Sequence, residues 1–292
     1  MTSIEDLKKV REDKLNILKE NGIDAYPSTT NRTHEISEIL EKFEEIEKEG
    51  NEIRLAGRIM SLRGQGKIFF SDLYDGTEKF QAVFRIDNLD NLELFGNVID
   101  IGDFVEVGGK LFITKSGQQS LDVSDWRVLT KTLLPIPDTF YGLKDDDERY
   151  RKRYLDLLLN TERKDLFYKK AKFWNIAQSF MIQRDFLSVE TPTLEITTGG
   201  AEARPFKTHH NDFDMDVFLR ISVGELWQKR LMAAGFPKTF EIGRVFRNEG
   251  SSAEHLQEFT NLECYAAFMN LDEGKELVKE LYQTLGKEVF GT

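Results

Sequence analysis

The sequence predicts an α+β protein in which a small β-barrel is followed by an antiparallel sheet with flanking helices. Residues 52–130 are rich in Val, Ile, Phe and Gly, and they contain five strand-like segments separated by turn residues. The C-terminal half instead contains a long helical segment and a hairpin with one polar and one apolar face. A chain of 292 residues is long enough for two domains with separate cores.

The overall composition excludes several classes of protein. A net charge of −11 and a pI near 5.1 argue against a general nucleic-acid binder, so any RNA contact must use local basic groups. The only cysteine, Cys264, excludes an internal disulfide. Residues 1–20 are charged throughout and do not resemble a signal peptide, and no segment is apolar enough to cross a membrane. We therefore expect a cytoplasmic protein without a membrane partner.

The first fifty residues are predicted to contain two helices. Ile4 to Asn21 has apolar residues at roughly helical spacing and ends at Asn21-Gly22, and Ser37 to Lys48 is a second, very acidic helix. The five strands that follow are predicted over Ile53–Leu62, Ile68–Tyr74, Lys79–Ile86, Asp103–Thr114 and Ser120–Leu129. Turns are predicted at Gly64-Gln65-Gly66, Asp75-Gly76-Thr77 and Ser116-Gly117. Five strands in this length favour an OB-fold barrel, the commonest small barrel that binds single-stranded nucleic acid.

The second half begins after Leu134-Pro135-Ile136-Pro137-Asp138, a linker followed by a basic cluster around residues 149–153. The predicted elements are a helix over Thr161–Arg184, a strand that follows it and ends at Thr191-Pro192, a strand around Val217–Val223, a helix over Gly224–Ala234, a hairpin over residues 240–268 and a helix over Leu271–Phe290. Asn270-x-x-Glu273 is a capping-box pattern for the last helix.

The hairpin is the most informative segment. With a period of two, Arg247 and Glu249 share a face of its first strand, and Phe259, Glu263 and Tyr265 share a face of its second strand. The opposite side of the second strand is apolar, with Leu262, Cys264, Ala266 and Phe268. Burying unpaired charge is costly, so the polar face is better explained by a ligand that has a phosphate, a flat ring and an amine.

Phe246 to Glu249 resembles motif 2 of the class II aminoacyl-tRNA synthetases, with its Phe-Arg-x-Glu signature. The resemblance implies that Arg247 binds the α-phosphate of ATP and the amino-acid carboxylate, and that it is the catalytic electrophilic group. It also implies that Glu249 binds the adenine amino group, that Phe259 stacks on adenine, and that His255 lies near the outer phosphates. The alternative is a solvated hairpin with an Arg247–Glu249 ion pair.

Two further segments extend the resemblance. The helix and strand that end at Thr191-Pro192 are similar to motif 1, which implies a homodimer with Pro192 at its interface; an ordinary core helix with an edge strand is the alternative. Residues 199–211, which contain Gly200 and the adjacent His209 and His210, are similar to the segment that covers the amino-acid pocket of lysyl-tRNA synthetases. Adjacent strand residues point to opposite faces, so we expect no metal site from the two histidines.

The amino-acid specificity is predicted from Glu225-Leu226-Trp227-Gln228-Lys229-Arg230. In lysyl-tRNA synthetases the matching glutamate binds the α-ammonium group of lysine, whereas aspartyl and asparaginyl relatives usually have glutamine there. The resemblance further implies that Glu263 and Tyr265 reach the ε-ammonium group, and that Gly200 lets backbone approach the ligand. Ser222-x-x-Glu225 could instead be a capping box for the helix that follows.

In the barrel, Arg58, Phe70 and Gln81 match positions with which this subfamily reads the central anticodon uridine. The resemblance implies that Phe70 stacks on the base while Gln81 and Arg58 hydrogen-bond its edge. A core phenylalanine with two surface polar residues is the alternative. The domain organisation then becomes a helical extension (residues 1–50), an OB-fold anticodon-binding domain (51–132), a linker (133–155) and the N-terminal part of a class II catalytic domain (156–292).

The implied function is that of a bacterial-type lysine–tRNA ligase, with ATP, L-lysine and tRNA(Lys) as partners. Lysine is activated to lysyl-adenylate and then transferred to the 3′ end of tRNA(Lys). Nothing in the sequence matches motif 3, and the acidic residues that hold Mg²⁺ in this family are also absent, so we expect no metal ligands in this chain and Mg²⁺ only in a full-length enzyme. We expect a piece of a longer synthetase, or of a split enzyme, with weak or no activity.

Three alternatives remain. One is a non-catalytic tRNA-binding or regulatory paralogue that keeps the barrel and the dimer helix. Another is an aspartyl- or asparaginyl-type synthetase. A third relative lysylates a protein instead of tRNA, but it typically lacks the barrel.

Overall fold

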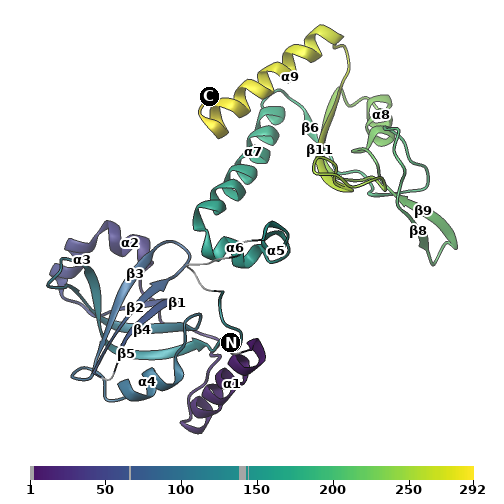
Figure 1. Cartoon of the computed structure of the whole chain (residues 1–292). Coiled ribbons are helices and arrows are strands. Elements are labelled where there is room, and N and C mark those ends of the chain that lie inside the picture. The colour runs from purple at the N-terminus through teal and green to yellow at the C-terminus, as the bar shows by residue number, and fades with distance from the viewer. Residues whose placement is uncertain (1–2, 66, 138–142, 144) are drawn as a thin grey trace. The chain divides into compact units, whose positions relative to one another are not determined.

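The computed structural model describes residues 3–65, 67–137, 143 and 145–292, so Gly66 of the predicted first turn and Asp138 of the predicted linker lie outside the described residues. The chain forms two compact units, Met1–Leu159 and Asn160–Thr292. Each unit has its own core and is described by itself below (Figure 1).

The first unit contains a closed five-stranded barrel, as predicted. Its strands are β1 (Ile53–Gln65), β2 (Ile68–Tyr74), β3 (Lys79–Arg85), β4 (Phe104–Ile113) and β5 (Gln119–Thr130). They are hydrogen-bonded in the order β1-β2-β3-β5-β4, and β4 closes the barrel against β1. The β3–β5 pair is parallel and the other pairs are antiparallel.

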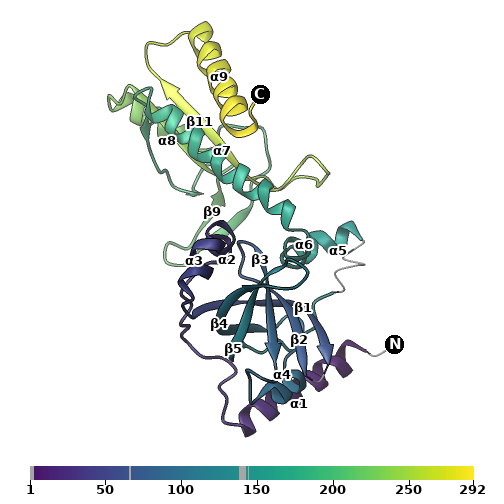
Figure 2. The same cartoon turned by 90° about the vertical axis from the view of Figure 1, so that its left-hand side faces the viewer.

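The helices of this unit are α1 (Ile4–Glu20), α2 (Ile36–Glu41), α3 (Phe43–Glu49), α4 (Leu92–Val98), α5 (Asp146–Arg151) and α6 (Arg153–Leu159). The predicted acidic helix is interrupted at Lys42, whose backbone leaves the helical region, and so becomes α2 and α3. Both lie at the other end of the barrel from α1 and α4, which lie side by side (Figure 2).

Helix α4, which the sequence did not predict, contributes large apolar side chains to the barrel core. Phe95 of α4 is fully buried, and its ring stacks on Phe84 with centroids 4.1 Å apart and meets Trp126 edge-on at 5.1 Å. Such ring pairs add to the hydrophobic gain of burying large side chains. Helix α1 is attached to the rest of this unit by polar contacts. For example, the Arg11 guanidinium donates to the Ile101 carbonyl at 2.9 Å.

The second unit contains two three-stranded sheets, β11-β10-β6 and β7-β9-β8. Its strands are β6 (Leu187–Ser188), β7 (Leu194–Glu195), β8 (Lys207–His210), β9 (Met215–Leu219), β10 (Lys238–Phe246) and β11 (Glu258–Ala266). Its helices are the 3₁₀ turn η1 (Thr161–Arg163), α7 (Lys164–Ile182), α8 (Glu225–Ala233), α9 (Leu271–Leu285) and the π-helical turn η2 (Gly286–Phe290).

Several predicted elements of this unit have other bounds. The strand expected to end at Thr191-Pro192 is shorter than predicted, since only β6 forms before that point and β7 begins after it. The strand expected near Val217–Val223 is β9. Phe268 does not join the apolar face of the hairpin: β11 ends at Ala266, and Phe268 is fully exposed with φ +58°. Side chains alternate between the two faces only within a strand. Phe268 lies beyond the end of β11, so the prediction that it joins the apolar face is wrong.

The apolar face of the hairpin is covered by α7 and α9, as the hairpin pattern implies. Phe240 of β10 packs with Phe180 and Met181 of α7, and Leu262 and Cys264 of β11 join this cluster. Asn270 caps α9 through the predicted capping box with Glu273. None of the helices in the described ranges is long and apolar enough to cross a membrane.

Candidate active site

The polar face of the β10–β11 hairpin carries most of the predicted ligand groups. The antiparallel register places Phe259 opposite Val245 and Glu263 opposite Glu241. Phe259, Glu263 and Tyr265 therefore point to the same side of β11, as predicted, while Leu262 and Cys264 point to the apolar core.

Arg247 and Glu249 lie beyond the end of β10, so their predicted place within the strand is wrong. The Arg247 amide still donates to the Gln257 carbonyl at 2.8 Å, which keeps Arg247 next to the hairpin face. Its Nε donates to the Ile221 carbonyl at 3.3 Å, and its Cζ lies 5.2 Å from the centre of the Phe259 ring. Glu249 follows in the turn and is exposed.

The Arg247 guanidinium is held by a carbonyl and a ring rather than by a carboxylate. Among the described residues no carboxylate lies within 4.0 Å of it, so the alternative of an Arg247–Glu249 ion pair does not hold there. A half-buried guanidinium with its outer nitrogens available can bind a phosphate or carboxylate in a bidentate manner. His255 lies in the exposed loop after Gly250, where its Nδ1 is 2.7 Å from the Ser252 hydroxyl.

Gly200 lies against the start of α8, with φ +89°. A Cβ at this position would be 2.1 Å from the Ser222 hydroxyl and 2.3 Å from Glu225 Oε2, closer than any side chain could tolerate. The Ser222 hydroxyl donates to the carbonyl of Gly199 at 2.8 Å. The N-cap of α8 is Gly224 without a side-chain cap, so the alternative of a Ser222–Glu225 capping box is excluded.

Each of the two predicted lysine-binding carboxylates uses one oxygen for the protein itself. Glu225 Oε1 binds the ammonium of Lys229, while its Oε2 faces Gly200. Glu263 Oε1 accepts from the Val223 amide and from the Asn261 amide group, both at 2.9 Å. In the described part of the chain the second oxygens have no hydrogen-bond donor, so they remain available to a cation.

Tyr265 is electrostatically coupled to this pair of carboxylates. Burial raises the pKa of its phenol, and the negative charges of Glu225 and Glu263 raise it further, whereas Lys229 opposes them. The phenol therefore stays protonated beside two carboxylates at neutral pH. This combination attracts an ammonium group and repels a carboxylate.

A buried ion pair that the sequence patterns did not predict lies on the polar side of the hairpin. Arg220 Nη1 lies 2.5 Å from Glu241 Oε1, and both residues are about 4% exposed. Glu241 Oε2 also accepts from the Thr191 hydroxyl at 2.6 Å. Period-two counting back from Arg247 already places Glu241 on the polar face. The partner of Glu241 could not be predicted from the sequence, because Arg220 belongs to a separate segment of the chain.

The remaining predicted residues of this unit lie elsewhere. Pro192 is exposed in the loop between β6 and β7, beside Thr191. His209 and His210 diverge on β8: His209 Nε2 lies 3.3 Å from an Asp214 carboxylate oxygen, and the His210 ring lies 4.6 Å from that of Phe213. No three His, Cys, Asp or Glu side chains within the described ranges are grouped as a bound metal would require.

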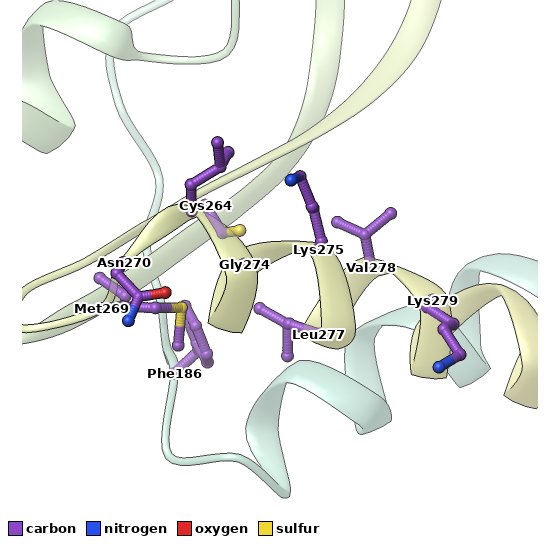
Figure 3. Close-up of a pocket in the computed structure, with 11 residues that line it drawn as sticks. Phe186, Cys264, Met269, Asn270, Gly274, Lys275, Leu277, Val278 and Lys279 are labelled. Atoms are coloured by element: carbon purple, nitrogen blue, oxygen red, sulfur yellow. The ribbon is translucent and has the colours of Figure 1, made fainter.

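A pocket of about 630 Å³ lies on the opposite, apolar side of the hairpin, between β11 and α9 (Figure 3). Cys264, Leu277 and Val278 contribute to its lining. Burial raises the pKa of the Cys264 thiol, so it behaves as an apolar group there. We place the candidate site on the other side, because the charged groups converge there and not in this pocket.

The three predicted barrel residues share the outer face of β1, β2 and β3. Ser71 and Leu73 of β2 are fully buried in the barrel, so Phe70 and Tyr74 point outward. Arg58 is opposite Tyr74 in the register. Phe70 is half-buried and lies outside the barrel core, so the alternative of a core phenylalanine is excluded.

Gln81 joins the same face because it lies opposite the outward-facing Asp72. Its amide donates to the Ser120 hydroxyl at 3.0 Å. Arg58 lies over the Phe104 ring at 4.5 Å, and burial lowers its pKa. The three side chains thus form one surface that combines an aromatic ring, an amide and a guanidinium, the groups with which proteins bind unstacked bases.

Comparison with known proteins identifies the family of the chain. Residues 145–292 match the family model of tRNA synthetases class II (D, K and N). The chain belongs to this family. Residues 53–129 match the OB-fold nucleic acid binding domain, in agreement with the closed barrel of this class II synthetase chain.

Curated relatives of this synthetase chain are named lysine–tRNA ligase. The Moorella thermoacetica protein is 45% identical over 289 residues, which are 98% of this chain and 58% of that protein. The Bacillus subtilis protein is 40% identical over 296 residues, or 99% of this chain and 59% of that protein. Lysine–tRNA ligase 2 of Methanosarcina acetivorans is 43% identical over 275 residues, 93% of this chain and 54% of that protein. The chain thus spans somewhat over half the length of these relatives.

Proposed function

We propose that this chain carries the lysine- and ATP-binding face and the anticodon-binding barrel of a lysine–tRNA ligase. The whole protein forms lysyl-adenylate from lysine and ATP, and then transfers the lysyl group to the terminal ribose of tRNA(Lys). The chemistry rests on positioning and electrostatics, since no side chain of the site is placed as a nucleophile. The proposal includes a cytoplasmic location, where tRNA is charged for translation.

One observation carries the choice of lysine: Glu225, Glu263 and Tyr265 meet around the Val223–Gly224 turn. Each carboxylate has one oxygen without a hydrogen-bond donor among the described residues, and the phenol adds a hydrogen-bond acceptor. We assign Glu225 to the α-ammonium and Glu263 with Tyr265 to the ε-ammonium of lysine, with Gly200 closing over the ligand. An aspartate substrate would place a carboxylate beside two others, which costs several kcal/mol.

The nucleotide is assigned to the neighbouring end of the hairpin. Phe259 stacks on adenine, and Glu249 accepts from its amino group. Arg247, fixed by the Ile221 carbonyl, binds the α-phosphate and stabilises the charge that develops as the lysine carboxylate attacks the phosphorus. His255 is assigned to the outer phosphates. Because the described residues do not fit a metal ion, we derive no step through Mg²⁺.

The homodimer part of the proposal is supported by exposed apolar side chains of the second unit. Leu166 and Phe167 on α7 are 69% and 48% exposed, so the second unit by itself does not cover these apolar side chains. Leu194, two residues after Pro192, is 50% exposed. Exposed apolar groups of this kind mark surfaces that another protein surface covers.

Isothermal titration of the chain with a non-hydrolysable lysyl-sulfamoyl adenosine tests the site, and the aspartyl analogue is the comparison. We expect the lysyl compound to bind at least ~100-fold more tightly, because an unpaired or repelled buried charge costs about 3 kcal/mol. Glu225→Gln should remove most of this preference. Equal affinity, or preference for the aspartyl compound, would overturn the assignment. Binding of tRNA(Lys) without either analogue would favour the non-catalytic paralogue.

A further inference from the structure

The buried side chain of helix α8 is a glutamine. Gln228 is fully buried, whereas every other residue of this helix is at least partly exposed. Helices usually face a sheet with apolar side chains, because a buried amide must be hydrogen-bonded to offset its lost hydration. The contact of α8 with the sheet is therefore polar and directional at its centre.

Both ends of the Gln228 amide group are hydrogen-bonded, and they bind different elements. Its Nε2 donates to the Val223 carbonyl at 2.9 Å and lies 3.5 Å from the Glu263 carbonyl oxygen. Its Oε1 accepts from the hydroxyl of Thr239, which is also fully buried, at 3.0 Å. One side chain thus joins α8 to the turn that precedes it and to strands β10 and β11.

The turn before α8 is held from two sides. The Val223 amide donates to Glu263 Oε1 at 2.9 Å, while the Val223 carbonyl accepts from Gln228. Gly224 follows with φ +66°, and a Cβ there would lie 2.3 Å from the Thr191 hydroxyl oxygen. The start of α8 is therefore fixed by close packing and by these two hydrogen bonds.

The other partner of Gln228 lies next to the candidate phenol. Thr239 is directly opposite Tyr265 in the register of β10 and β11, so the two side chains share one face of the hairpin. Glu225 is three residues before Gln228 on α8, a spacing that makes them neighbours on the helix surface. Gln228 thus connects the residue assigned to the α-ammonium group with those assigned to the ε-ammonium group.

We propose that Gln228 is a positioning residue that sets the separation between Glu225 and Glu263, and hence the length of the diamino acid that fits between them. The inference rests on the proposed function of this face. An apolar side chain of similar size could also pack α8 against the sheet, but its contacts are not directional. A fully hydrogen-bonded amide instead favours one position of the helix, because a shift of α8 would leave buried polar groups without partners.

Isothermal titration with lysyl- and ornithyl-sulfamoyl adenosine tests this role, because ornithine is shorter than lysine by one methylene group. We expect the wild type to bind the lysyl compound about 10- to 200-fold more tightly, the range for one missing methylene. Gln228→Met keeps the size of the side chain but removes its hydrogen bonds. It should lower the ratio of the two affinities about tenfold, because the separation of the two carboxylates is no longer fixed.

Thr239→Val and Thr239→Ser form a matched pair for the same network. The valine variant keeps the shape of the side chain and removes the hydroxyl that donates to Gln228, so it should lower the ratio in the same direction. The serine variant keeps the hydroxyl and should keep the wild-type ratio. Gln183→Met makes the same chemical change at the exposed C-cap of α7, and should leave the ratio within about twofold.

The ratio separates positioning from stability, since a variant that is only less stable loses affinity for both compounds by the same factor. If folded Gln228→Met keeps the wild-type ratio, or the wild type does not distinguish the two compounds, the inference is overturned. The proposed function still stands in that case if the wild type prefers the lysyl over the aspartyl compound. If the wild type does not bind the lysyl compound, both are overturned. Thr239→Val decides the outcome if Gln228→Met fails to fold.

Discussion

The barrel and the hairpin unit organise their polar and apolar groups in opposite ways. The barrel buries one large apolar cluster inside, and its candidate RNA-binding groups lie on the outer face, apart from the core. The hairpin has two small apolar clusters on one side only. Its other side buries the Arg220–Glu241 ion pair, and Glu241 lies opposite Glu263 in the strand register.

In the barrel, the residues that stabilise the core are therefore different from the candidate ligand-binding residues. In the hairpin, a buried stabilising ion pair lies on the same face as the candidate ligand-binding residues. A substitution of Phe70 or Gln81 on the outer barrel face changes a half-buried group and leaves the core intact. In the hairpin, Arg220 also fixes the backbone around the site, because its Nε donates to the Arg244 carbonyl and its own carbonyl accepts from the Phe246 amide. The next residue, Ile221, provides the carbonyl that holds Arg247.

The largest expected effect is from Arg220→Met. Removing one partner of a buried ion pair leaves Glu241 uncompensated, which destabilises by about 3–5 kcal/mol. Hydrogen exchange measured by mass spectrometry should show much faster exchange in β10 and β11, with the barrel strands unchanged. The control is Glu258→Gln, which breaks an exposed pair with Arg244 (3.6 Å, 54% exposed side chains) and should change little. Equal loss of protection in the barrel would refute the separation of the two regions.

The next effect concerns acid stability of the barrel. Burial would raise the pKa of Glu106, but hydrogen bonds from Thr30, the Asn31 amide and Arg127 lower it to about 2. Since the folded pKa lies below the ordinary value of 4.5, Glu106 stabilises the fold above pH 4.5, and this contribution is lost as the pH falls toward 2. The loss amounts to roughly 3 kcal/mol.

Urea unfolding at pH 7, 4.5 and 2.5 measures this contribution. The barrel of Glu106→Gln should be less stable than the wild type at pH 7, and the difference should shrink at pH 2.5. If the wild type and the variant lose stability in parallel, Glu106 is not the group that titrates, and the barrel does not depend on this carboxylate.

Local sequence patterns correctly predicted those elements whose structure depends on residues close together in the sequence. Alternation predicted the barrel strands and the apolar side of β11, and the capping box placed the start of α9. The same counting failed where the backbone leaves the regular period: Glu249 lies in the turn after β10, and Phe268 follows β11 with a left-handed backbone. The period of two predicts which face of a sheet a side chain occupies only while the residue remains in the hydrogen-bonded strand.

The long-range parts of the site could not be derived from local patterns. Glu263 was predicted on the polar face, but its bond to the Val223 amide joins segments 40 residues apart. Arg220 and Glu241 each look like an ordinary charged strand residue until the fold brings them together. The position of Gly200 against Glu225 likewise depends on tertiary packing, although a paired glycine indicated close backbone approach.

Gly200→Ala tests how tightly the glycine loop fits over the lysine site. The new Cβ would meet Ser222 and Glu225 at just over 2 Å, so Glu225 must move. We expect the affinity for lysyl-sulfamoyl adenosine to fall about 10- to 100-fold, equal to about 1.4–2.7 kcal/mol. Gly235→Ala is the matched control, since Gly235 also has a positive φ (+94°) but has open space around its Cβ position. Equal losses in both variants would attribute the effect to backbone strain rather than to the site.

The smallest expected effect is from Asn270→Ala, which removes the cap of α9. Its side chain accepts from the Asp272 and Glu273 amides at 2.9 and 3.0 Å, and loss of such a cap costs about 1 kcal/mol. Because α9 covers only the apolar side of the hairpin, urea unfolding should detect this loss while the affinity for lysyl-sulfamoyl adenosine stays within twofold. A larger loss of affinity would show that the apolar side also transmits strain to Glu263 and Tyr265, and that the two faces of β11 are not independent.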